Sequence, residues 1–426
     1  MYKHLNELIK NKKINIGIFG LGYVGLPLAL RFAHKKFNVY GYDSNKKKIS
    51  TLQSGKSYIK QISSVIIKKY INNKLNVFDN FNNVENLDVL IFCLPTPLKK
   101  NNNPNLTFLK LCLEKIEKKI RKGQIFVHES TSYPGTTEEY FEKIFKRKKF
   151  KIGKDCFLVF SPEREDPGNK IFNIKNITKV VSGKTSKCLS LGEQLYKMIV
   201  NDVFKVKDIK TAEMTKLVEN IFRSVNIGLV NEMKIICERL GIDIWDVIEA
   251  AKSKPFGFYP FSPGPGVGGH CIPVDPIILS WKAKKNNIKT QFIDLASKIN
   301  NLMPYYVAKK TNSAIKKKFP PKKNKVCLIG VAYKPDVDDY RESPSSKIIN
   351  ILKTKYKSHV EYCDPLIPIF EATAQNPYKL KSIKLNYGSF KNYDAVLIIT
   401  NHKLFDYKKI YKYSKLIIDT RGVYKE

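Results

Sequence analysis

The stretch INIGIFGLGYVG, at residues 14–25, decides the fold of this chain. Residues 14–19 form an apolar run typical of a short buried strand, and the turn GLGYVG follows at once in the pattern G-x-G-x-x-G. Glycines in this pattern permit a tight turn and let the backbone approach a pyrophosphate at the start of a helix. The sequence therefore predicts a dinucleotide site whose contacts come from Gly20, Gly22, Tyr23, Val24 and Gly25.

An acidic residue follows the glycine turn at the distance that such sites need. Residues 37–42 predict a second strand that ends at Asp43, 18 residues after Gly25. A carboxylate placed there accepts hydrogen bonds from the adenosine ribose hydroxyls, and its charge would repel a 2′-phosphate. We therefore expect NAD rather than NADP. Lys48 is consistent both with a contact to this ribose and with a solvated surface lysine.

Strand-like runs continue through the first half of the chain and alternate with helix-length segments, as in a parallel doubly wound α/β sheet. These runs lie at residues 88–93, 125–130, 156–161, 179–182 and 203–206. Such sheets bind ligands beyond the carboxyl ends of their strands. Thr96 and Thr131, each shortly after a strand, are therefore candidate cofactor contacts, with ordinary turns as the alternative.

A long helix is predicted over residues 208–240, because apolar side chains recur there at three- and four-residue spacing. Lys216 and Asn220 lie four residues apart, hence one turn apart on the same face of this helix. A cation and an amide donor on one face would stabilise a developing oxyanion. A solvated surface lysine is the alternative.

A glycine-rich loop, PGPGVGGHCIPVD at residues 263–275, follows this helix. It sets Cys271, a potential nucleophile, four residues before Asp275, a potential proton acceptor. Gly266 and Gly268 let the backbone come close to a substrate. The alternative is a surface turn with a half-buried cysteine, because a free thiol usually behaves as a small hydrophobic group.

A helical stretch at residues 276–318 and a lysine- and proline-rich linker at 316–325 lead into a second α/β unit. This unit lacks G-x-G-x-x-G, and its strand-like runs lie at residues 325–330, 359–363, 394–399 and 415–419. Lys334, Arg341 and Arg421 lie near strand ends, where they suit a phosphate or pyrophosphate, with plain surface charges as the alternative.

The predicted architecture is α/β, with two Rossmann-like doubly wound domains joined by a long central helical region. We expect a dinucleotide-binding domain at residues 1–207, a helical domain with the cysteine loop at residues 208–318, and a C-terminal Rossmann-like domain at residues 319–426.

Composition argues against several other classes of protein. The 426 residues contain 8 cysteines without a CxxC pair or zinc-ligand spacing, so we expect no metal site. No apolar run approaches the roughly 20 residues of a membrane span, and the N-terminus lacks a signal-peptide hydrophobic region, which predicts a cytoplasmic protein. The formal charge of +38 would favour anionic partners. Its lysines are spread along the chain, however, and no nucleic-acid-binding motif occurs, so we expect no specific nucleic-acid partner.

The order of the motifs resembles that of the UDP-sugar 6-dehydrogenases over nearly the full length of the chain. The matching motifs are GLGYVG at residues 20–25, EST at 129–131, SPE at 161–163, KLxxN at 216–220, GPGVGGHCxPxD at 264–275 and AYKxDxDDxRESP at 332–344. SPEREDPGN at 161–169 and KPFGF at 254–258 look most like the bacterial UDP-N-acetylglucosamine 6-dehydrogenases of surface-polysaccharide synthesis.

The resemblance implies an NAD-dependent, two-step oxidation of the sugar C6 alcohol to a carboxylate. On the matched positions, Cys271 would be the nucleophile that forms a thiohemiacetal and then a thioester. Lys216 and Asn220 would hold the oxyanion. The residues that would position water and move protons are Asp275, Glu163 and Thr131.

The resemblance also implies homodimers built around the central helix and a UDP group held by the C-terminal domain. Near the glycine-rich loop, Lys254, Phe256 and Phe258 are candidate substrate contacts. One position departs from the family, because members that act on UDP-glucose carry a second glutamate where this chain has Pro167, and Glu165 is not assigned that role.

UDP-N-acetylglucosamine is the expected substrate, and the N-acetylmannosamine, N-acetylgalactosamine and glucose nucleotides are alternatives. Two other classes stay open. One is a Rossmann-type protein that binds nucleotides or nucleic acid without turnover, and the other is a single-step hydroxyacid dehydrogenase, which would need no cysteine.

Overall fold

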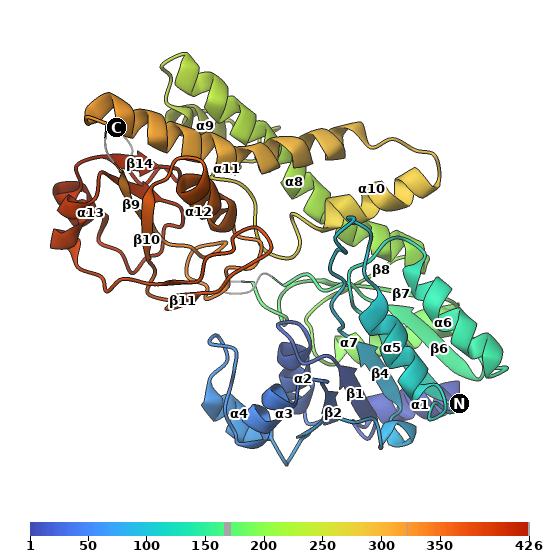
Figure 1. Cartoon of the computed structure of the whole chain (residues 1–426). Coiled ribbons are helices and arrows are strands. Elements are labelled where there is room, and N and C mark those ends of the chain that lie inside the picture. Colours follow the sequence, from blue (N-terminus) through green and yellow to red (C-terminus); the bar gives the residue numbers. More distant parts are fainter. Residues whose placement is uncertain (166–171, 322, 425–426) are drawn as a thin grey trace. The chain divides into compact units, whose positions relative to one another are not determined.

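The computed structural model describes residues 1–165, 172–321 and 323–424, which form two compact units, Met1–Glu219 and Asn220–Glu426 (Figure 1). The boundary between the units falls within helix α8 (Ile209–Arg239). Each unit contains its own sheet and its own hydrophobic cores.

The first unit is built on an eight-stranded sheet with the order β3-β2-β1-β4-β5-β6-β7-β8. Strand β4 pairs with β1 on the side opposite β2, so the strand order reverses direction at β1, where such sheets bind ligands. The strands are β1 (Asn15–Phe19), β2 (Asn38–Tyr42), β3 (Leu75–Phe78), β4 (Val89–Phe92), β5 (Gln124–His128), β6 (Cys156–Phe160), β7 (Lys179–Gly183) and β8 (Val203–Lys205).

Two features of this sheet differ from the sequence-based prediction. Strand β3 was not predicted, and β7 pairs with β6 in the antiparallel sense, with Val159 opposite Gly183. A parallel pair needs a long crossover, usually a helix. The described parts of the connection, residues 161–165 and 172–178, contain no helix, which is consistent with the antiparallel pairing.

Helices cover both faces of this sheet. One face packs against α1 (Tyr2–Lys10), α2 (Gly25–His34), α3 (Lys46–Gln53), α4 (Ser64–Tyr70) and α7 (Ser186–Lys197). The other face packs against α5 (Thr107–Ile116) and α6 (Thr136–Arg147), with the short 3-10 helix η1 (Val84–Asn86) nearby. Every residue of β4, β5 and β6 is buried, as expected for parallel strands covered on both faces.

The second unit combines long helices with a four-stranded parallel sheet of order β10-β9-β13-β14. Its helices before the sheet are α9 (Ile244–Lys252), α10 (Asp275–Lys285) and α11 (Gln291–Lys318), in addition to most of α8. The single helical stretch predicted at residues 276–318 is therefore two helices. The break follows Asn286 and Asn287, and Asn287 has a φ of 59° that an α-helix cannot accommodate.

Helices also cover both faces of the second sheet, α11 and α12 (Pro344–Thr354) on one face and α13 (Tyr407–Tyr413) with η2 (Tyr387–Asn392) on the other. Its strands are β9 (Lys325–Ile329), β10 (His359–Cys363), β13 (Ala395–Ile398) and β14 (Ile417–Asp419). A small antiparallel pair, β11 (Ile369–Phe370) and β12 (Leu380–Lys381), was not predicted. Two Rossmann-like sheets and the long helices α8 and α11 confirm the predicted fold class.

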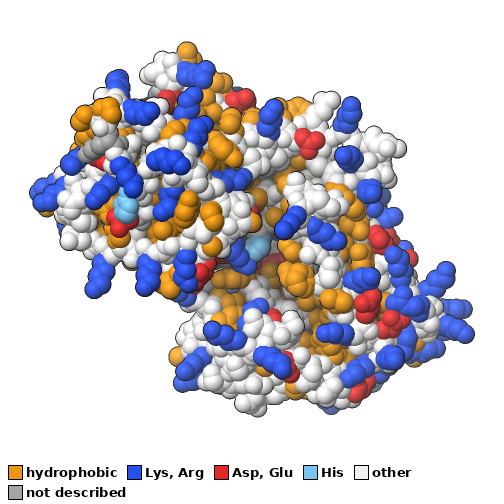
Figure 2. Space-filling view, in the orientation of Figure 1, with side chains coloured by type: hydrophobic (Ala, Val, Ile, Leu, Met, Phe, Trp, Pro, Cys, Tyr) orange, Lys and Arg blue, Asp and Glu red, His pale blue; other side chains and the backbone are white. Residues whose placement is uncertain are grey.

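The surface reflects the composition of the chain. Figure 2 shows lysine and arginine side chains scattered over the visible face rather than gathered into one patch. Among the described residues, none of the helices is both long and apolar enough to cross a bilayer.

Candidate active site

The glycine turn after β1 leaves room for a ligand at its second glycine. Gly20 has a φ of 96°, and a Cβ there would collide with the Cys93 carbonyl at the end of β4. A Cβ at Gly25 would collide with the Gly20 carbonyl, whereas a Cβ at Gly22 would meet nothing within 4 Å. Packing therefore accounts for the first and third glycines, and open space beside the second fits a pyrophosphate at the start of α2.

The predicted ribose acceptor lies beside this turn. The carboxylate of Asp43 accepts hydrogen bonds from the backbone N–H of Leu21 (3.1 Å) and of Asn45 (2.9 Å). The Lys48 ammonium lies 3.0 Å from the same carboxylate. The Tyr58 hydroxyl donates to the Leu21 carbonyl and so holds the turn from the other side. The turn, the acid and Lys48 thus form one group, and Tyr58 is a member that the sequence did not indicate.

The two predicted threonine contacts also meet. Thr96 follows β4, Thr131 follows β5, and these strands are neighbours in the sheet. The Thr96 hydroxyl donates to the Thr131 carbonyl at 2.6 Å. Two further predicted contacts belong to the glycine turn itself. Tyr23 is half-buried, and Val24 is the N-cap residue of α2.

Glu163 is held as an anion at the end of β6. Its Oε1 accepts from the backbone N–H of Arg164 and of Glu165, both at 2.6 Å, and its Oε2 lies 3.4 Å from the Lys179 ammonium. Burial alone would raise the pKa of Glu163, but Lys179, the two amides and Lys216 together hold it below its usual value. A carboxylate in this state accepts a proton rather than donating one.

The loop after Glu163 carries a second carboxylate. Burial, and then the charge of Glu163, raise the pKa of Glu165 to about 7. Pro167, the position that departs from the family, lies outside the described residues.

The first turns of α8 are fixed to the first unit by Glu213, which accepts from the backbone N–H of Thr137 at 2.9 Å and from the Thr137 hydroxyl at 2.7 Å. Lys216 follows one turn later and is only 8% exposed, and its charge lowers the pKa of Glu163. A buried ammonium near a carboxylate is unlike a solvated surface lysine, which was the alternative reading.

In the second unit, the cysteine loop forms the turn before α10. The Cys271 carbonyl accepts from the backbone N–H of Val274 (3.1 Å) and of Asp275 (2.9 Å). Asn220 donates its side-chain amide to Asp275, and both of these side chains are only 3% exposed. All eight cysteines lie in the described part of the chain, and Cys271 alone is exposed. The structure therefore places the exposed Cys271 in the turn that leads directly into the buried Asn220–Asp275 pair.

The glycine-rich loop packs against the segment 332–344. A Cβ at Gly268 would stand 2.8 Å from the Tyr333 Cβ, and the Gly269 N–H donates to the Arg341 carbonyl at 3.1 Å. A Cβ at Gly266, which has a φ of 130°, would press on Pro304 at 3.2 Å. These glycines are required by close approach of the backbone to its neighbours.

Buried amides hold the start of the same loop. The Gly264 N–H donates to the Asn231 side chain at 2.8 Å, and Asn231 donates in turn to Asn300 at 2.9 Å. All three lie in the described core of the second unit. Asn231 and Asn300 were not predicted, because buried asparagines on helices look like solvated ones in sequence.

Of the three predicted anion-binding residues, Arg421 lies at the glycine-rich loop, whereas Arg341 is paired with a neighbouring acid. A Cβ at Gly264 would stand 2.8 Å from the Arg421 guanidinium, so Arg421 lies directly at the loop. Burial lowers the pKa of Arg421 to about 10, which still leaves it charged at neutral pH. Arg341 instead pairs with Asp339 at 2.6 Å, and Lys334 is half-buried in the same segment.

The segment 253–260 is exposed, and no contact of Lys254, Phe256 or Phe258 with Arg421 is among the described interactions. The Lys254 ammonium lies 4.8 Å from the Phe256 ring centroid, and Phe256 is 70% exposed. The structure therefore does not bring these three candidates into the group around Arg421.

Three family profiles match the chain in succession. They are the NAD binding domain over residues 14–200, the central domain over residues 210–302 and the UDP binding domain over residues 327–426, all of the UDP-glucose/GDP-mannose dehydrogenase family. A UDP-N-acetyl-D-mannosamine dehydrogenase of Campylobacter jejuni is 32% identical over 93% of this chain and 97% of its own length. The chain belongs to the UDP-glucose/GDP-mannose dehydrogenase family.

Other members of the family match over similar lengths. The UDP-N-acetyl-D-glucosamine 6-dehydrogenase of Pseudomonas aeruginosa is 33% identical over 92% of each chain. The solved structure of a UDP-D-ManNAc dehydrogenase from Pyrococcus horikoshii superposes with a TM-score of 0.87 at 30% identity, over 97% of this chain and 96% of that one. The chain is thus an NAD-dependent UDP-sugar 6-dehydrogenase, which confirms the resemblance and the expected cofactor.

Several residues around the site of this dehydrogenase were not predicted. Lys179 lies within the first unit and pairs with Glu163, which was predicted. Tyr196 donates its hydroxyl to Glu129 in the same unit. Nothing in the sequence distinguished them. Glu129 stands in the EST motif next to two polar residues, and an acid directly after a buried strand was a signal that could have found it.

Proposed function

We propose that this dehydrogenase oxidises the C6 hydroxymethyl group of UDP-N-acetylglucosamine to a carboxylate in two steps, with Cys271 as the nucleophile. The observation that carries the proposal is the exposed Cys271 in the same turn as Asp275, whose buried carboxylate accepts from Asn220. Overall, one alcohol, two NAD⁺ and one water give one carboxylate, two NADH and three protons. Bound NAD⁺ accepts a hydride in each step.

In this proposal the chain supplies covalent chemistry between the two oxidations. The Cys271 sulfur bonds to C6 of the aldehyde, and the carbonyl π electrons move to oxygen to give a thiohemiacetal. Asn220 and Lys216 stabilise the oxyanion, the amide by a hydrogen bond and the ammonium by its charge. Loss of the second hydride from C6 leaves a thioester.

Hydrolysis of the thioester then releases the product. Water bonds to C6, its proton passes to a carboxylate, and the C6–sulfur bond breaks to regenerate the Cys271 thiolate. The lowered pKa of Glu163 supports this residue as the acceptor, with Thr131 and Asp275 positioning the water.

The acetamido sugar is supported by relatives named for two epimers. The match to a UDP-N-acetyl-D-glucosamine 6-dehydrogenase supports the gluco substrate. Several relatives, and the Pyrococcus horikoshii structure, are named for the manno sugar, which makes UDP-N-acetylmannosamine the second candidate. The diphosphate would be held by Arg421, with Lys334 and Arg341 nearby in the UDP-binding domain.

The test compares initial rates of NADH formation with the gluco, manno and galacto UDP-N-acetylhexosamines and with UDP-glucose. We expect the gluco substrate to give the highest kcat/KM and Cys271→Ala to lower it by about 10³-fold or more. Cys112→Ala, a change at a buried cysteine in α5, is the matched control and should stay near the wild-type rate. Undiminished turnover at one NADH per sugar in both wild type and Cys271→Ala would instead support a single-step dehydrogenase, and no turnover with any sugar would support a binding protein.

We further propose a cytoplasmic homo-oligomer that works in surface-polysaccharide synthesis. Helix α8 presents exposed apolar side chains along its length, among them Phe222 (51%), Leu229 (53%) and Ile236 (44%). Large apolar side chains exposed in series mark an association surface. Light scattering of wild type and Leu229→Glu would check this, with a smaller particle expected for the variant.

A further inference from the structure

A buried cluster of charges lies behind Glu163 in the first unit. The Lys179 ammonium, on β7, lies 2.8 Å from Glu129 and 3.4 Å from Glu163. The side chains of Lys179 and Glu129 are 6% and 0% exposed. Tyr196, on α7, donates its hydroxyl to the other oxygen of Glu129. One buried cation thus serves two carboxylates, and the nearer carboxylate has an additional donor.

Fold stability alone does not account for this cluster. Withdrawing charges from water costs several kcal/mol per ion, and well-packed apolar side chains of similar size stabilise a core equally well or better. The cluster touches a carboxylate to which we have assigned a role in the proposed reaction, and a cation 3.4 Å away favours the ionised form of that carboxylate.

The other charged and titratable groups around Glu163 are few and identifiable. Lys216 of α8 adds a second positive charge, whereas Glu165 of the same loop, with its pKa raised to about 7 by burial and by the charge of Glu163, is largely neutral at acidic pH. Arg164 is engaged elsewhere, since it pairs with Glu219 at 2.7 Å and donates to the Thr178 carbonyl. Burial keeps the thiol of Cys93, the residue after β4, and the Tyr196 phenol of α7 neutral by raising the pKa of each.

We propose that Lys179 and Glu129 are positioning residues that set the pKa of Glu163. The Lys179 ammonium lowers this pKa by stabilising the Glu163 carboxylate. Glu129 raises it, because Glu129 pairs with the same ammonium and weakens its effect on Glu163. The proposal rests on the proposed role of Glu163 as proton acceptor in thioester hydrolysis. Neither residue touches the substrate in this account, and both act through the Glu163 carboxylate.

The two residues should act in opposite directions. Lys179→Met removes the cation that favours the ionised form of Glu163, so the pKa of Glu163 rises and hydrolysis is lost at a higher pH. Glu129→Gln leaves Lys179 to serve Glu163 alone, so the pKa of Glu163 falls and hydrolysis persists to a lower pH. We expect shifts of about one pH unit, which is tenfold in rate on the acidic limb.

A double variant separates this role from a structural one. Lys179→Met alone strands Glu129 as an unpaired buried charge and should lower the Tm, whereas Lys179→Met/Glu129→Gln removes both charges and should recover most of the Tm. In the double variant Glu163 still lacks its cation. The pH below which hydrolysis slows, called here the acidic limb, should therefore stay higher than in the wild type even though the Tm recovers.

The experiment follows the sugar adduct on Cys271 by intact mass, with enzyme in excess over UDP-N-acetylglucosamine, saturating NAD⁺ and quenching at intervals between pH 3 and 8, because the pKa of Glu163 lies below its usual 4.5. If the protein turns over the manno epimer instead, that sugar is used. Lys184→Met is the control, because Lys184 pairs with Glu138 and Glu142 away from Glu163. Glu163→Gln should abolish the acidic limb of adduct decay.

The outcomes distinguish a failure of the roles of Lys179 and Glu129 from a failure of the role of Glu163 as proton acceptor. Opposite shifts in the single variants, with the upward shift kept in the double variant, support the proposal. If the acidic limb of the double variant returns to the wild-type pH when the Tm recovers, the role of the two residues is purely structural and the proposal is overturned. A limb that persists in Glu163→Gln overturns both this inference and the role of Glu163, whereas loss of the limb in Glu163→Gln without shifts in the others overturns the inference alone.

Discussion

The two Rossmann-like sheets begin in the same way. In each, the first strand ends at a glycine with positive φ, Gly20 (96°) after β1 and Gly330 (72°) after β9. At each glycine, a Cβ would collide with a backbone carbonyl that follows the neighbouring strand. An aspartate follows the second strand of each sheet. Asp43 accepts from the N–H after Gly20, and Asp364 accepts from the N–H after Gly330.

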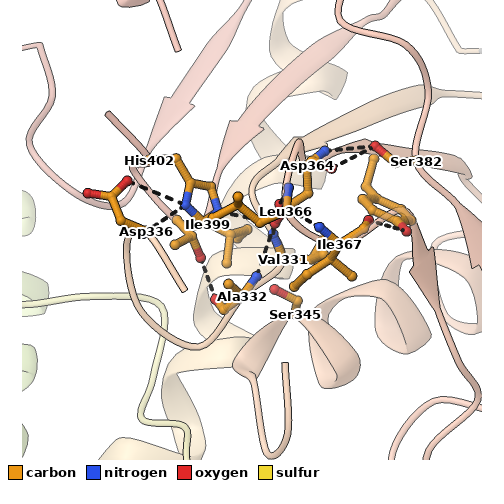
Figure 3. A network of polar contacts seen from close by, with 12 residues as sticks. Val331, Ala332, Asp336, Ser345, Asp364, Leu366, Ile367, Ser382, Ile399 and His402 are labelled. Atoms are coloured by element: carbon orange, nitrogen blue, oxygen red, sulfur yellow. Dashed lines mark hydrogen bonds and ion pairs between the residues drawn. The ribbon is translucent and has the colours of Figure 1, made fainter. Parts of the chain in front are cut away.

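The environments of these two aspartates differ. The side chain of Asp43 is 10% exposed, and its side-chain partner is Lys48, whose side chain is 33% exposed. Asp364 has no exposure and accepts from a buried set of donors shown in Figure 3, the backbone N–H groups of Val331, Ala332, Leu366 and Ile367 and the ring of His402. Its acceptor positions are therefore occupied, and no ribose hydroxyl can reach it.

The ring of His402 connects this acid to the segment that carries the anion-binding candidates. The Asp336 N–H donates to His402 Nδ1 at 2.9 Å, which assigns the ring proton to Nε2, and Nε2 donates to Asp364 at 3.1 Å (Figure 3). The comparison teaches that one backbone geometry serves two purposes. The first sheet leaves its acid partly exposed, where we propose that it contacts the cofactor, and the second uses its acid to fix the loop that follows Gly330.

The largest expected effect is on the stability of the second unit. Asp364→Ala would leave buried N–H groups and His402 without their acceptor, at a cost of about 3–5 kcal/mol in the free energy of unfolding. Asp43→Ala removes a partly exposed acid with fewer donors and should cost less, about 1 kcal/mol. Denaturant unfolding followed by circular dichroism measures both. Equal losses in the two variants would contradict the comparison.

The next effect is on cofactor binding. Asp43→Ala should weaken NAD⁺ binding by about 10–100-fold, because the ribose hydroxyls lose a charged acceptor. It should also narrow the preference for NAD⁺ over NADP⁺, since the repulsion of a 2′-phosphate is removed. Titration of both cofactors by calorimetry checks this, with Glu85→Ala, an exposed acid of η1, as a control. Unchanged NAD⁺ affinity would remove Asp43 from the cofactor site.

The smallest effect concerns acid unfolding. Burial alone would raise the pKa of Asp364, but the hydrogen bond from His402 and the backbone N–H donors hold it below the usual 3.8. Because the folded pKa is the lower one, Asp364 stabilises the fold above pH 3.8, and this contribution is lost as the pH falls toward the folded value. The difference in unfolding free energy between wild type and Asp364→Asn should be constant above about pH 5 and shrink by about 1.4 kcal/mol per pH unit below pH 3.8. A difference that grows with acid would contradict the assignment.

Local pattern was sufficient to predict most strands and the cofactor turn. Parallel strands buried on both faces read as continuous apolar runs, and a glycine forced by a carbonyl contact has a fixed place in the motif. Strand β3 escaped because its four residues include a polar one and are surrounded by asparagines and aspartate. The antiparallel pairing of β7 depends on how the chain returns to the sheet, which no local pattern records.

The site was predictable where its residues occupy motifs and unpredictable where burial assigns the role. Cys271, Asn220 and Asp275 stand in motifs, and the structure places them together. Lys179 is one of 76 lysines and arginines, and only its position on a buried strand distinguishes it from solvated ones. Arg341 was a candidate for an anion, but the structure pairs it with Asp339, which a spacing of two residues does not reveal.

The central claim is that one chain carries the alcohol through both oxidations with Cys271 as the covalent link. The direct measurement is the amount of NADH, read at 340 nm, formed per UDP-N-acetylglucosamine consumed when the reaction runs to completion. The account predicts two NADH per sugar nucleotide and a carboxylate product, both abolished in Cys271→Ala. One NADH per sugar with release of the aldehyde, or two NADH that persist without Cys271, would contradict it.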